Sequence, residues 1–361
     1  METKADTLAK IVLDSMLGLE YKHKIKLISL VKNAEELFDF PKKAEAYLAE
    51  NLGASKTATI RSALKDEDYH RFVIDKLKKS GTKCITLGSE KYPFLLSQTI
   101  VPPFVLYCNG NTELLNGEAT FAIVGSRKCM PDYIARAKNF SKELSDLGAV
   151  IVTGSAGGAD TAAIEGALGS GRIISVLAGG VGHVYPQFNR SLVEDVAKRG
   201  LVVSEQPPDQ ESKPWMFPMR NRIIAGLSKG VLIVGGDLDS GARHTAYHAA
   251  EYGRDVFAFP YSLGVPSGRL NNELIKSGCE LCSELKDVTD FLKLEKENKE
   301  ELKLDGLKAE IYQNIASGTS DVYGIVEKMG IPVYELAPIL SEMEIDGVIV
   351  KLSGNKYKTI K

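Results

Sequence analysis

Small and polar residues directly follow several short apolar runs of this chain, and they are the residues best placed to bind a ligand. The runs 121–125, 149–154 and 231–236 each end in glycine. Loops of small residues that lead into helix N-termini bind anions, because their backbone N–H groups are free and a phosphate can approach closely. The plainer alternative is that these glycines only form tight turns between strands and helices. We predict a phosphate-binding crevice with the candidate residues Ser126, Arg127, Gly157, Gly158, Ser240 and Gly241.

A second group of candidates lies in the segment 215–227, which reads WMFPMRNRIIAGL. The planar guanidinium of arginine suits phosphate oxygens and stacks on bases, and an asparagine amide can hydrogen-bond. We therefore add Arg220, Asn221 and Arg222 to the predicted site. Ordinary ion pairing remains the alternative for each arginine, and residues two apart on a helix point in different directions.

Two aromatic residues, Trp215 and Phe217, precede these arginines. Aromatic rings form stacking platforms for unpaired bases in many nucleic-acid-binding proteins. Core packing is the more common fate of such large apolar side chains. We therefore expect both rings in the core, with base stacking as the alternative.

The sequence holds no recognisable catalytic or metal-binding arrangement. Neither the dinucleotide fingerprint G-x-G-x-x-G after the run 121–125 nor a P-loop is present. His244 and His248 are four residues apart but lack an H-E-x-x-H pattern. Cys279 and Cys282 form a C-x-x-C pair without a second pair nearby, and we interpret them as apolar thiols in a short strand. The expectation is a protein that is not an enzyme and has no cofactor and no metal.

Helical segments alternate with apolar runs through the centre of the chain. Runs that are apolar throughout indicate strands buried on both faces. Repeated strand–helix alternation indicates a parallel sheet with right-handed crossovers, and such sheets bind ligands at the carboxyl ends of their strands. We predict an α/β fold with a Rossmann-like, doubly wound parallel sheet as its core. The six runs are 121–125, 149–154, 172–179, 201–205, 231–236 and 255–260.

The rest of the chain divides around this core. Residues 1–80 are charged and helical in pattern and predict a small helical domain of the SAM or helix-hairpin-helix kind. The core spans residues 81–292, and the charged residues 293–305 are expected to form a linker. Residues 306–361 read as three short helices and a hairpin that turns at Ser353-Gly354-Asn355, which predicts a C-terminal winged-helix domain.

The expected recognition helix of this last domain is acidic and contains no lysine or arginine. Acidic side chains are repelled by phosphates, so reading of a DNA major groove is doubtful and contact with a protein is at least as good an interpretation. Lysines lie instead on the expected wing. The acidic residues are Glu335, Glu342, Glu344 and Asp346, and the wing lysines are Lys351, Lys356 and Lys358.

Composition excludes several broad classes. The net charge is −2, so this is not a broadly polybasic nucleic-acid binder, although a local basic groove remains compatible with that charge. No apolar run approaches the length needed to cross a bilayer, and the N-terminus lacks the pattern of a signal peptide. The expectation is a cytoplasmic protein without membrane contact.

Motifs along residues 85–285 resemble the DprA/Smf family of DNA-processing proteins. The most specific stretch is FPMRNRIIAGLS at 217–228, and the matching motifs occur in the family's order. The other stretches are IVGSR at 123–127, TGSAGGAD at 153–160, EGAL at 165–168, GGVGHVYPQFN at 179–189, Ser204-Glu205, Ser240-Gly241 with Thr245-Ala246, and NELI at 272–275. Ile164 and Ala242 stand where the family usually has a histidine and a serine, and the family usually has a glutamate near Gly235.

This resemblance implies a protein that binds and protects incoming single-stranded DNA and loads the RecA recombinase onto it during natural transformation. It also implies a homodimer formed through the core. Its motif positions place Arg127, Gly157, Gly158, Arg220, Asn221 and Arg222 in the DNA-binding pocket. Two alternatives stay open: a nucleotide-binding or phosphoribohydrolase-like enzyme on the same scaffold, and a winged-helix transcription regulator.

Overall fold

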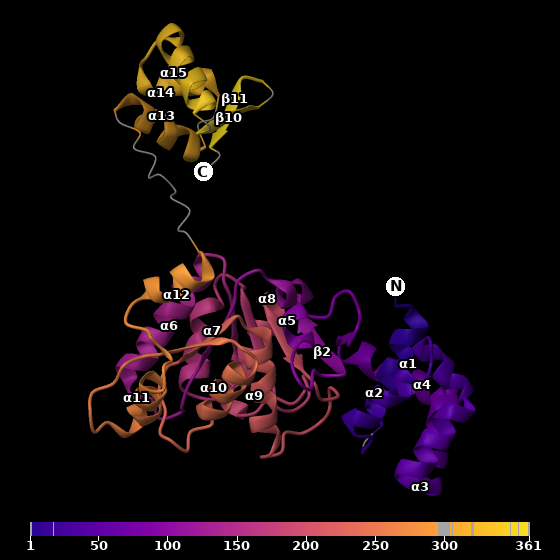
Figure 1. The fold of residues 1–361 in the computed structure, drawn as a ribbon. Helices are drawn as coiled ribbons and strands as arrows, with labels where there is room; N and C mark the ends of the chain where they lie inside the picture. Colours follow the sequence, from indigo (N-terminus) through magenta and orange to yellow (C-terminus); the bar gives the residue numbers. More distant parts are fainter. Residues whose placement is uncertain are drawn as a thin grey trace. The chain divides into compact units, whose positions relative to one another are not determined.

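The computed structural model describes residues 2–16, 18–294, 304, 306–318, 321–346, 348–352 and 354–359. The chain divides into two compact units, Met1–Leu294 and Glu295–Lys361, which are treated separately below (Figure 1). None of the described helices combines the length and the apolarity that crossing a membrane requires.

The first unit begins with helices that pack on each other and on the adjoining sheet (Figure 1). Thr3 starts the first helix with a capping box, because its hydroxyl accepts a hydrogen bond from Asp6 N at 3.0 Å and Asp6 Oδ2 accepts one from Thr3 N at 3.1 Å. No strand occurs in the described residues before Lys83. The helices are α1 (Lys4–Ser15), α2 (Tyr21–Ser29), the 3-10 helix η1 (Ala34–Asp39), α3 (Lys42–Lys65) and α4 (Glu67–Lys79).

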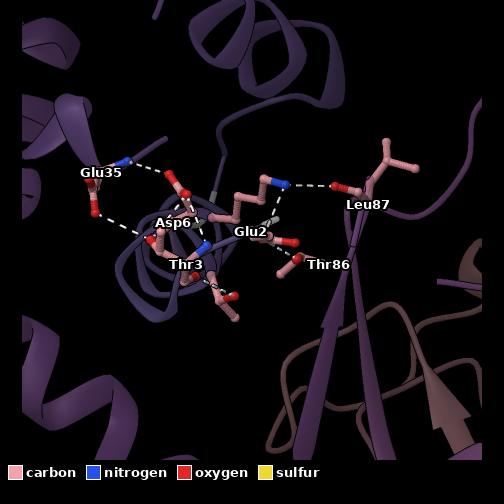
Figure 2. Close-up of polar contacts among 8 residues, drawn as sticks. Glu2, Thr3, Asp6, Glu35, Thr86 and Leu87 are labelled. Atoms are coloured by element: carbon pink, nitrogen blue, oxygen red, sulfur yellow. Dashed lines mark hydrogen bonds and ion pairs between the residues drawn. The ribbon is translucent and has the colours of Figure 1, made fainter. Parts of the chain in front are cut away.

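The start of α1 is fastened to the sheet by polar contacts (Figure 2). Thr86 donates a hydrogen bond to Glu2 Oε1 at 2.6 Å, and Lys10 Nζ donates one to the carbonyl oxygen of Leu87 at 2.8 Å. On the other side of α1, Glu35 N donates to Asp6 Oδ1 at 3.1 Å. The helical segment and the sheet therefore form one body.

A buried interdomain cluster completes this attachment. Asp14 accepts hydrogen bonds from Lys24 Nζ and from the hydroxyl of Tyr107, both at 2.8 Å. Arg222 pairs with Glu205 close by, and the charges of Asp14 and Lys24 act on Glu205. Burial raises the pKa of Asp14 and of Glu205, and the neighbouring cation opposes the shift in each case. These five residues are called the interdomain cluster from here on.

One nine-stranded sheet forms the centre of this unit, in the order β1-β2-β6-β5-β4-β3-β7-β8-β9. All six predicted runs form strands, and these pair in parallel. Two strands were not expected: β1 and β2 add an antiparallel edge next to β6. The strands are β1 (Lys83–Thr86), β2 (Val105–Gly110), β3 (Thr120–Val124), β4 (Val150–Thr153), β5 (Ile173–Val176), β6 (Leu201–Ser204), β7 (Gly230–Ile233), β8 (Asp255–Ala258) and β9 (Glu280–Leu281).

Helices cover both faces of the sheet, so each central strand is buried on both sides. Phe121 and Ile123 pack into one apolar core, whereas Ala122 and Val124 pack into the other. The first core receives α6 (Pro131–Asp146), α7 (Ala159–Ala167), α8 (Arg190–Arg199) and α12 (Leu285–Leu292). The second core receives α5 (Phe94–Ser97), α9 (Met216–Leu227), α10 (Ala242–Glu251) and α11 (Arg269–Lys276).

The direction of winding reverses at β3. The chain runs from β3 outward through β4, β5 and β6, and it then returns to place β7 and β8 on the other side of β3. Doubly wound sheets bind ligands at such a reversal, because the loops after the two central strands diverge to opposite faces and leave a crevice. The candidate residues after β3 and β7 flank this crevice.

The second unit has a separate small apolar core. Its described elements are α13 (Leu307–Ala316), α14 (Val322–Met329), α15 (Val333–Ile345) and the antiparallel hairpin of β10 (Ile349–Leu352) and β11 (Lys356–Thr359). This is the predicted order of helices and hairpin, and the winged-helix class itself stays a prediction. Ser353 of the predicted turn and most of the predicted linker 293–305 lie outside the described residues.

Candidate functional site

A pocket of about 710 Å³ opens at the reversal point of the sheet. The loop after β3, the start of α7, the exposed side of α9 and the start of α10 form its walls. Six of the nine predicted site residues line it: Ser126, Arg127, Arg220, Asn221, Ser240 and Gly241. Lining residues that the sequence reasoning did not select include Lys128, Asp160, Asp237, Asp239 and His244.

Two cationic side chains stand at the rim of the pocket. Arg127 and Lys128 are exposed, and neither side chain makes a hydrogen bond or an ion pair within the described part of the chain. Ser126 fixes the backbone of this loop, since its hydroxyl accepts a hydrogen bond from Lys128 N at 3.1 Å and its N–H donates to Gly235 O at 2.8 Å. The loop therefore presents two unpaired positive charges from a fixed backbone.

Gly158 packs closely against the backbone of that loop and does not line the pocket. Its φ is +80°, and a Cβ atom there would lie 2.7 Å from Ser126 O and 2.9 Å from Arg127 Cα. Only glycine suits both the backbone angle and this close approach. Gly157 also lies outside the lining, and a Cβ there would meet the ring of Phe188 at 3.2 Å.

Arg220 forms the buried back wall of the pocket together with Asp160, each with 5 % of its surface exposed. The Arg220 guanidinium donates to Val176 O, and its Nε donates to Asn221 Oδ1 at 3.1 Å. Burial raises the pKa of Asp160 to about 6, while the positive charge of Arg220 and hydrogen bonds from backbone N–H groups oppose the rise. Gly154 leaves the room for this pair, because a Cβ there would lie within 2.7 Å of both side chains.

Asn221 and Ser240 hold the start of α10 in place. Asn221 Nδ2 donates to Gly241 O at 3.1 Å, and Ser240 Oγ accepts from Ala242 N at 3.3 Å. The first turn of α10 therefore faces the pocket with its positive dipole end.

Arg222 belongs to a different part of the molecule. It pairs with Glu205 in the interdomain cluster and donates a second hydrogen bond to Val101 O at 2.5 Å. Since Arg220 and Arg222 are two residues apart on α9, they point to different sides of the helix. The structure does not bring Arg222 together with the other predicted site residues.

Aromatic rings gather beside the pocket. The expectation that Trp215 packs in the core is wrong, because 58 % of its surface is exposed, and Phe217 is half-buried in the pocket wall. Tyr185 meets the edge of Phe217 with a ring-centroid distance of 5.6 Å, and Phe188 is 75 % exposed. The sequence reasoning did not select Tyr185 or Phe188, although their place in the loop between β5 and α8 was a usable signal.

The three departures from the family pattern fall in different surroundings. Ile164 lies on α7, is fully buried in the first apolar core and does not line the pocket. A Cβ at Gly235 would lie 2.3 Å from the hydroxyl oxygen of Tyr261, so the glycine makes room for this tyrosine. Ala242 lines the pocket at the start of α10.

The arrangement suits an anionic ligand that also carries flat rings. Arg127, Lys128 and Arg220 line the pocket together with the first turn of α10, and exposed aromatic rings lie next to it. Asp237 and Asp239 add negative charge on the α10 side, and Arg269 pairs with Asp237 at 3.6 Å. No group of three or more side chains able to hold a metal ion occurs within the described ranges.

The fold and this pocket define a doubly wound α/β domain with a pocket at the reversal point of its sheet. The family model for DNA recombination-mediator protein A matches residues 83–293, and the chain belongs to that family, which includes the DprA and Smf proteins. The region matched holds the whole pocket.

Relatives and solved structures agree with this assignment. DNA processing protein DprA of Bacillus subtilis is 38% identical over 61% of this chain and 74% of its own length. Protein Smf of Escherichia coli is 32% identical over 82% of this chain and 83% of its own length. The crystal structure of DNA processing protein A from Streptococcus pneumoniae matches with a TM-score of 0.66 and 30% identity, covering 80% of this chain and 98% of that protein.

A structure that reports the single-stranded DNA binding mode of DNA processing protein A from Helicobacter pylori is also similar. It matches with a TM-score of 0.54 and 31% identity, covering 59% of this chain and 98% of that protein. DNA processing is thus the common function of the relatives that this chain resembles.

Proposed function

We propose that this protein binds single-stranded DNA in the pocket at the reversal point of its sheet. The observation that carries the proposal is the pair of unpaired cations, Arg127 and Lys128, at the rim of a pocket that has exposed aromatic rings beside it. Cations bind the phosphates of the strand, and bases that are not paired in a duplex are free to stack on the rings.

The role of the protein follows from this binding and from its relatives. It acts in the cytoplasm, protects incoming DNA during natural transformation and loads RecA onto it, without catalysing a reaction. Similarity to proteins named for DNA processing and for recombination mediation supports this role. A homodimer formed through the core and contact with RecA are further parts of the proposal, and light scattering and co-precipitation with RecA test them.

A binding titration tests the central claim. Fluorescence anisotropy should show tighter binding to a single-stranded oligonucleotide than to the duplex of the same sequence. The logarithm of the affinity should fall with the logarithm of the salt concentration, by about 0.7 per phosphate contacted. Arg127→Ala should weaken binding about tenfold, which corresponds to about 1.4 kcal/mol, and should reduce this slope.

Arg199→Ala is the matched control. Arg199 is exposed at the end of α8, directly before β6, and therefore lies at the amino end of the strands, away from the pocket. Equal affinities for Arg127→Ala and the unmodified protein would contradict the placement of the site. Hydrolysis of a nucleoside monophosphate would instead favour the phosphoribohydrolase-like alternative, which the size of the pocket also accommodates.

A further inference from the structure

A second hollow adjoins the pocket along α10. It has a volume of about 320 Å³ and is lined by Leu238, Asp239, Ser240, Arg243, His244 and Tyr247. Asp239, Ser240 and His244 also line the pocket at the reversal point. The two hollows therefore share a wall and form one continuous surface that runs along the first half of α10.

The helix side of this hollow carries a cation and an aromatic ring. Arg243 and Tyr247 are four residues apart on α10, so they lie on the same face, one turn from each other. Both are exposed, and 64 % of the surface of Tyr247 is open. The Arg243 guanidinium donates one hydrogen bond, to Leu238 O at 3.3 Å, which holds it over the hollow and leaves its other N–H groups for a ligand.

The ring of Tyr247 is braced from one side. The imidazole of His248 meets it edge-on at a centroid distance of 5.7 Å, and His248 in turn stacks on Tyr252 at 5.8 Å. A braced, exposed ring gives a stacking surface that loses little side-chain entropy when a ligand binds. An arginine one turn away from such a ring is the pairing that suits a phosphate followed by a base.

From this geometry we propose that the bound DNA strand leaves the pocket along α10, with a phosphate on Arg243 and a base stacked on Tyr247. The inference rests on the proposed function, and it adds the direction of the strand and the residues that hold its next part. Asp239 is the one carboxylate among the residues of this hollow, and it lies on the loop before α10. The phosphates therefore follow the helix side, away from that carboxylate.

A series of oligothymidylates, from about 4 to about 16 nucleotides, tests the extension by fluorescence anisotropy. In the unmodified protein the affinity should rise with length until the strand covers α10. Tyr247→Ala and Arg243→Ala should each lower the affinity about fivefold for the longest oligonucleotide, and the loss should shrink as the oligonucleotide shortens. Arg243→Ala should also reduce the salt slope by about 0.7.

Two controls separate stacking from other effects. Tyr247→Phe keeps the ring and should bind like the unmodified protein. Phe94→Ala removes another exposed aromatic ring, 70 % open on α5, and should change binding at no length.

Several results would overturn the extension. The first is equal affinity of Tyr247→Ala and the unmodified protein at every length. In that case the extension fails, and the effect of Arg127→Ala still tests binding in the pocket separately. The second is an equal loss of affinity at all lengths. It would mean either that Tyr247 contacts DNA within the pocket or that its removal destabilises the fold, and circular dichroism of the variant distinguishes these two cases. Failure of the unmodified protein to bind any oligonucleotide would remove the proposed function and the extension together.

Discussion

The pocket and the interdomain cluster both contain charged side chains, but the charges are paired in the cluster and unpaired at the rim of the pocket. In the interdomain cluster, Arg222 and Lys24 each meet a largely buried carboxylate. At the pocket rim, Arg127 and Lys128 are exposed and make no hydrogen bond or ion pair within the described residues, although the charge of Arg127 acts on Asp160. Paired, buried charges fix the position of protein segments, whereas unpaired, exposed cations are free to bind an external anion.

Arg220 lies between these two cases. It is buried like Arg222, but it faces the pocket and has the ionisable Asp160 beside it. Burial lowers the pKa of the Arg220 guanidinium, and the charge of Asp160 opposes that change. Arg220 therefore shapes the pocket wall, and the proposed phosphate contacts fall to the exposed cations Arg127 and Lys128.

The largest expected effect comes from breaking the interdomain cluster. Arg222→Ala leaves Glu205 buried without its partner, and removing one member of a buried pair costs about 3–5 kcal/mol of the free energy of unfolding. Urea denaturation measures this loss. The double variant Arg222→Leu, Glu205→Leu should recover much of it, because neither charge is then left unpaired. An unchanged free energy of unfolding in Arg222→Ala would contradict the stabilising role of this pair.

The next effect depends on pH and on Asp160. Its pKa is about 6 in the folded protein and 3.8 in the unfolded chain, so the folded state holds the proton more tightly. The stabilisation from this proton is complete below about pH 4 and is lost as the pH rises through about 6, a change of roughly 3 kcal/mol. Asp160→Asn should remove this part of the pH dependence, as thermal unfolding between pH 4 and pH 7 would measure.

The same carboxylate should affect DNA binding. An ionised Asp160 repels phosphate, so the affinity for an oligonucleotide should increase as the pH falls from about 7 toward 5.5, and less so in Asp160→Asn. A pH dependence of the affinity that survives unchanged in Asp160→Asn would contradict this role of the carboxylate.

A smaller effect is expected at the base of the loop after β3. Gly158→Ala introduces a Cβ against Ser126 O at a positive φ, which should cost about 1–3 kcal/mol of stability and displace Arg127. Gly148→Ala is the matched control, because its φ is +103° but no atom lies within 4 Å of the added Cβ. DNA affinity should fall only for the Gly158 variant. An equal fall in both would indicate a general effect of backbone strain.

The smallest effect concerns a single rim charge. Lys128→Ala should weaken binding to single-stranded DNA about threefold at low salt and less at high salt, because an exposed charge is screened by ions. Lys128→Arg keeps the charge and should retain most of the affinity. Affinity that does not depend on salt in either variant would argue against a phosphate contact at this position.

The sequence predicts the sheet well because its central strands are buried on both faces and must therefore be apolar throughout. It also locates the pocket, since the loops after β3 and β7 are short and must meet at one edge. It fails for β1, which is a four-residue edge strand with only two buried positions, and for β2, whose apolar residues directly follow Pro102-Pro103 and Phe104 and read as part of a connector.

The fate of the individual side chains was harder to predict. Arg220 and Arg222 have the same chemistry in the same motif, and only the rotation of α9 about its axis decides which one faces the pocket. Trp215 and Phe188 are exposed although both are large and apolar. Their spacing in the sequence does not reveal this exposure, because large apolar residues are more often buried. These features depend on packing between segments far apart in the chain.

Helix α9 carries a pocket residue and an interdomain residue within a single turn, and this has a thermodynamic consequence. A rigid helix does not rotate at Arg220 without also rotating at Arg222, so any movement of α9 displaces a pocket residue and a residue of the interdomain cluster together. Linkage is reciprocal: whatever factor DNA applies to the docking equilibrium, docking must apply to the affinity for DNA. If a bound strand shifts α9, the N-terminal helices therefore change the affinity for DNA by that same factor.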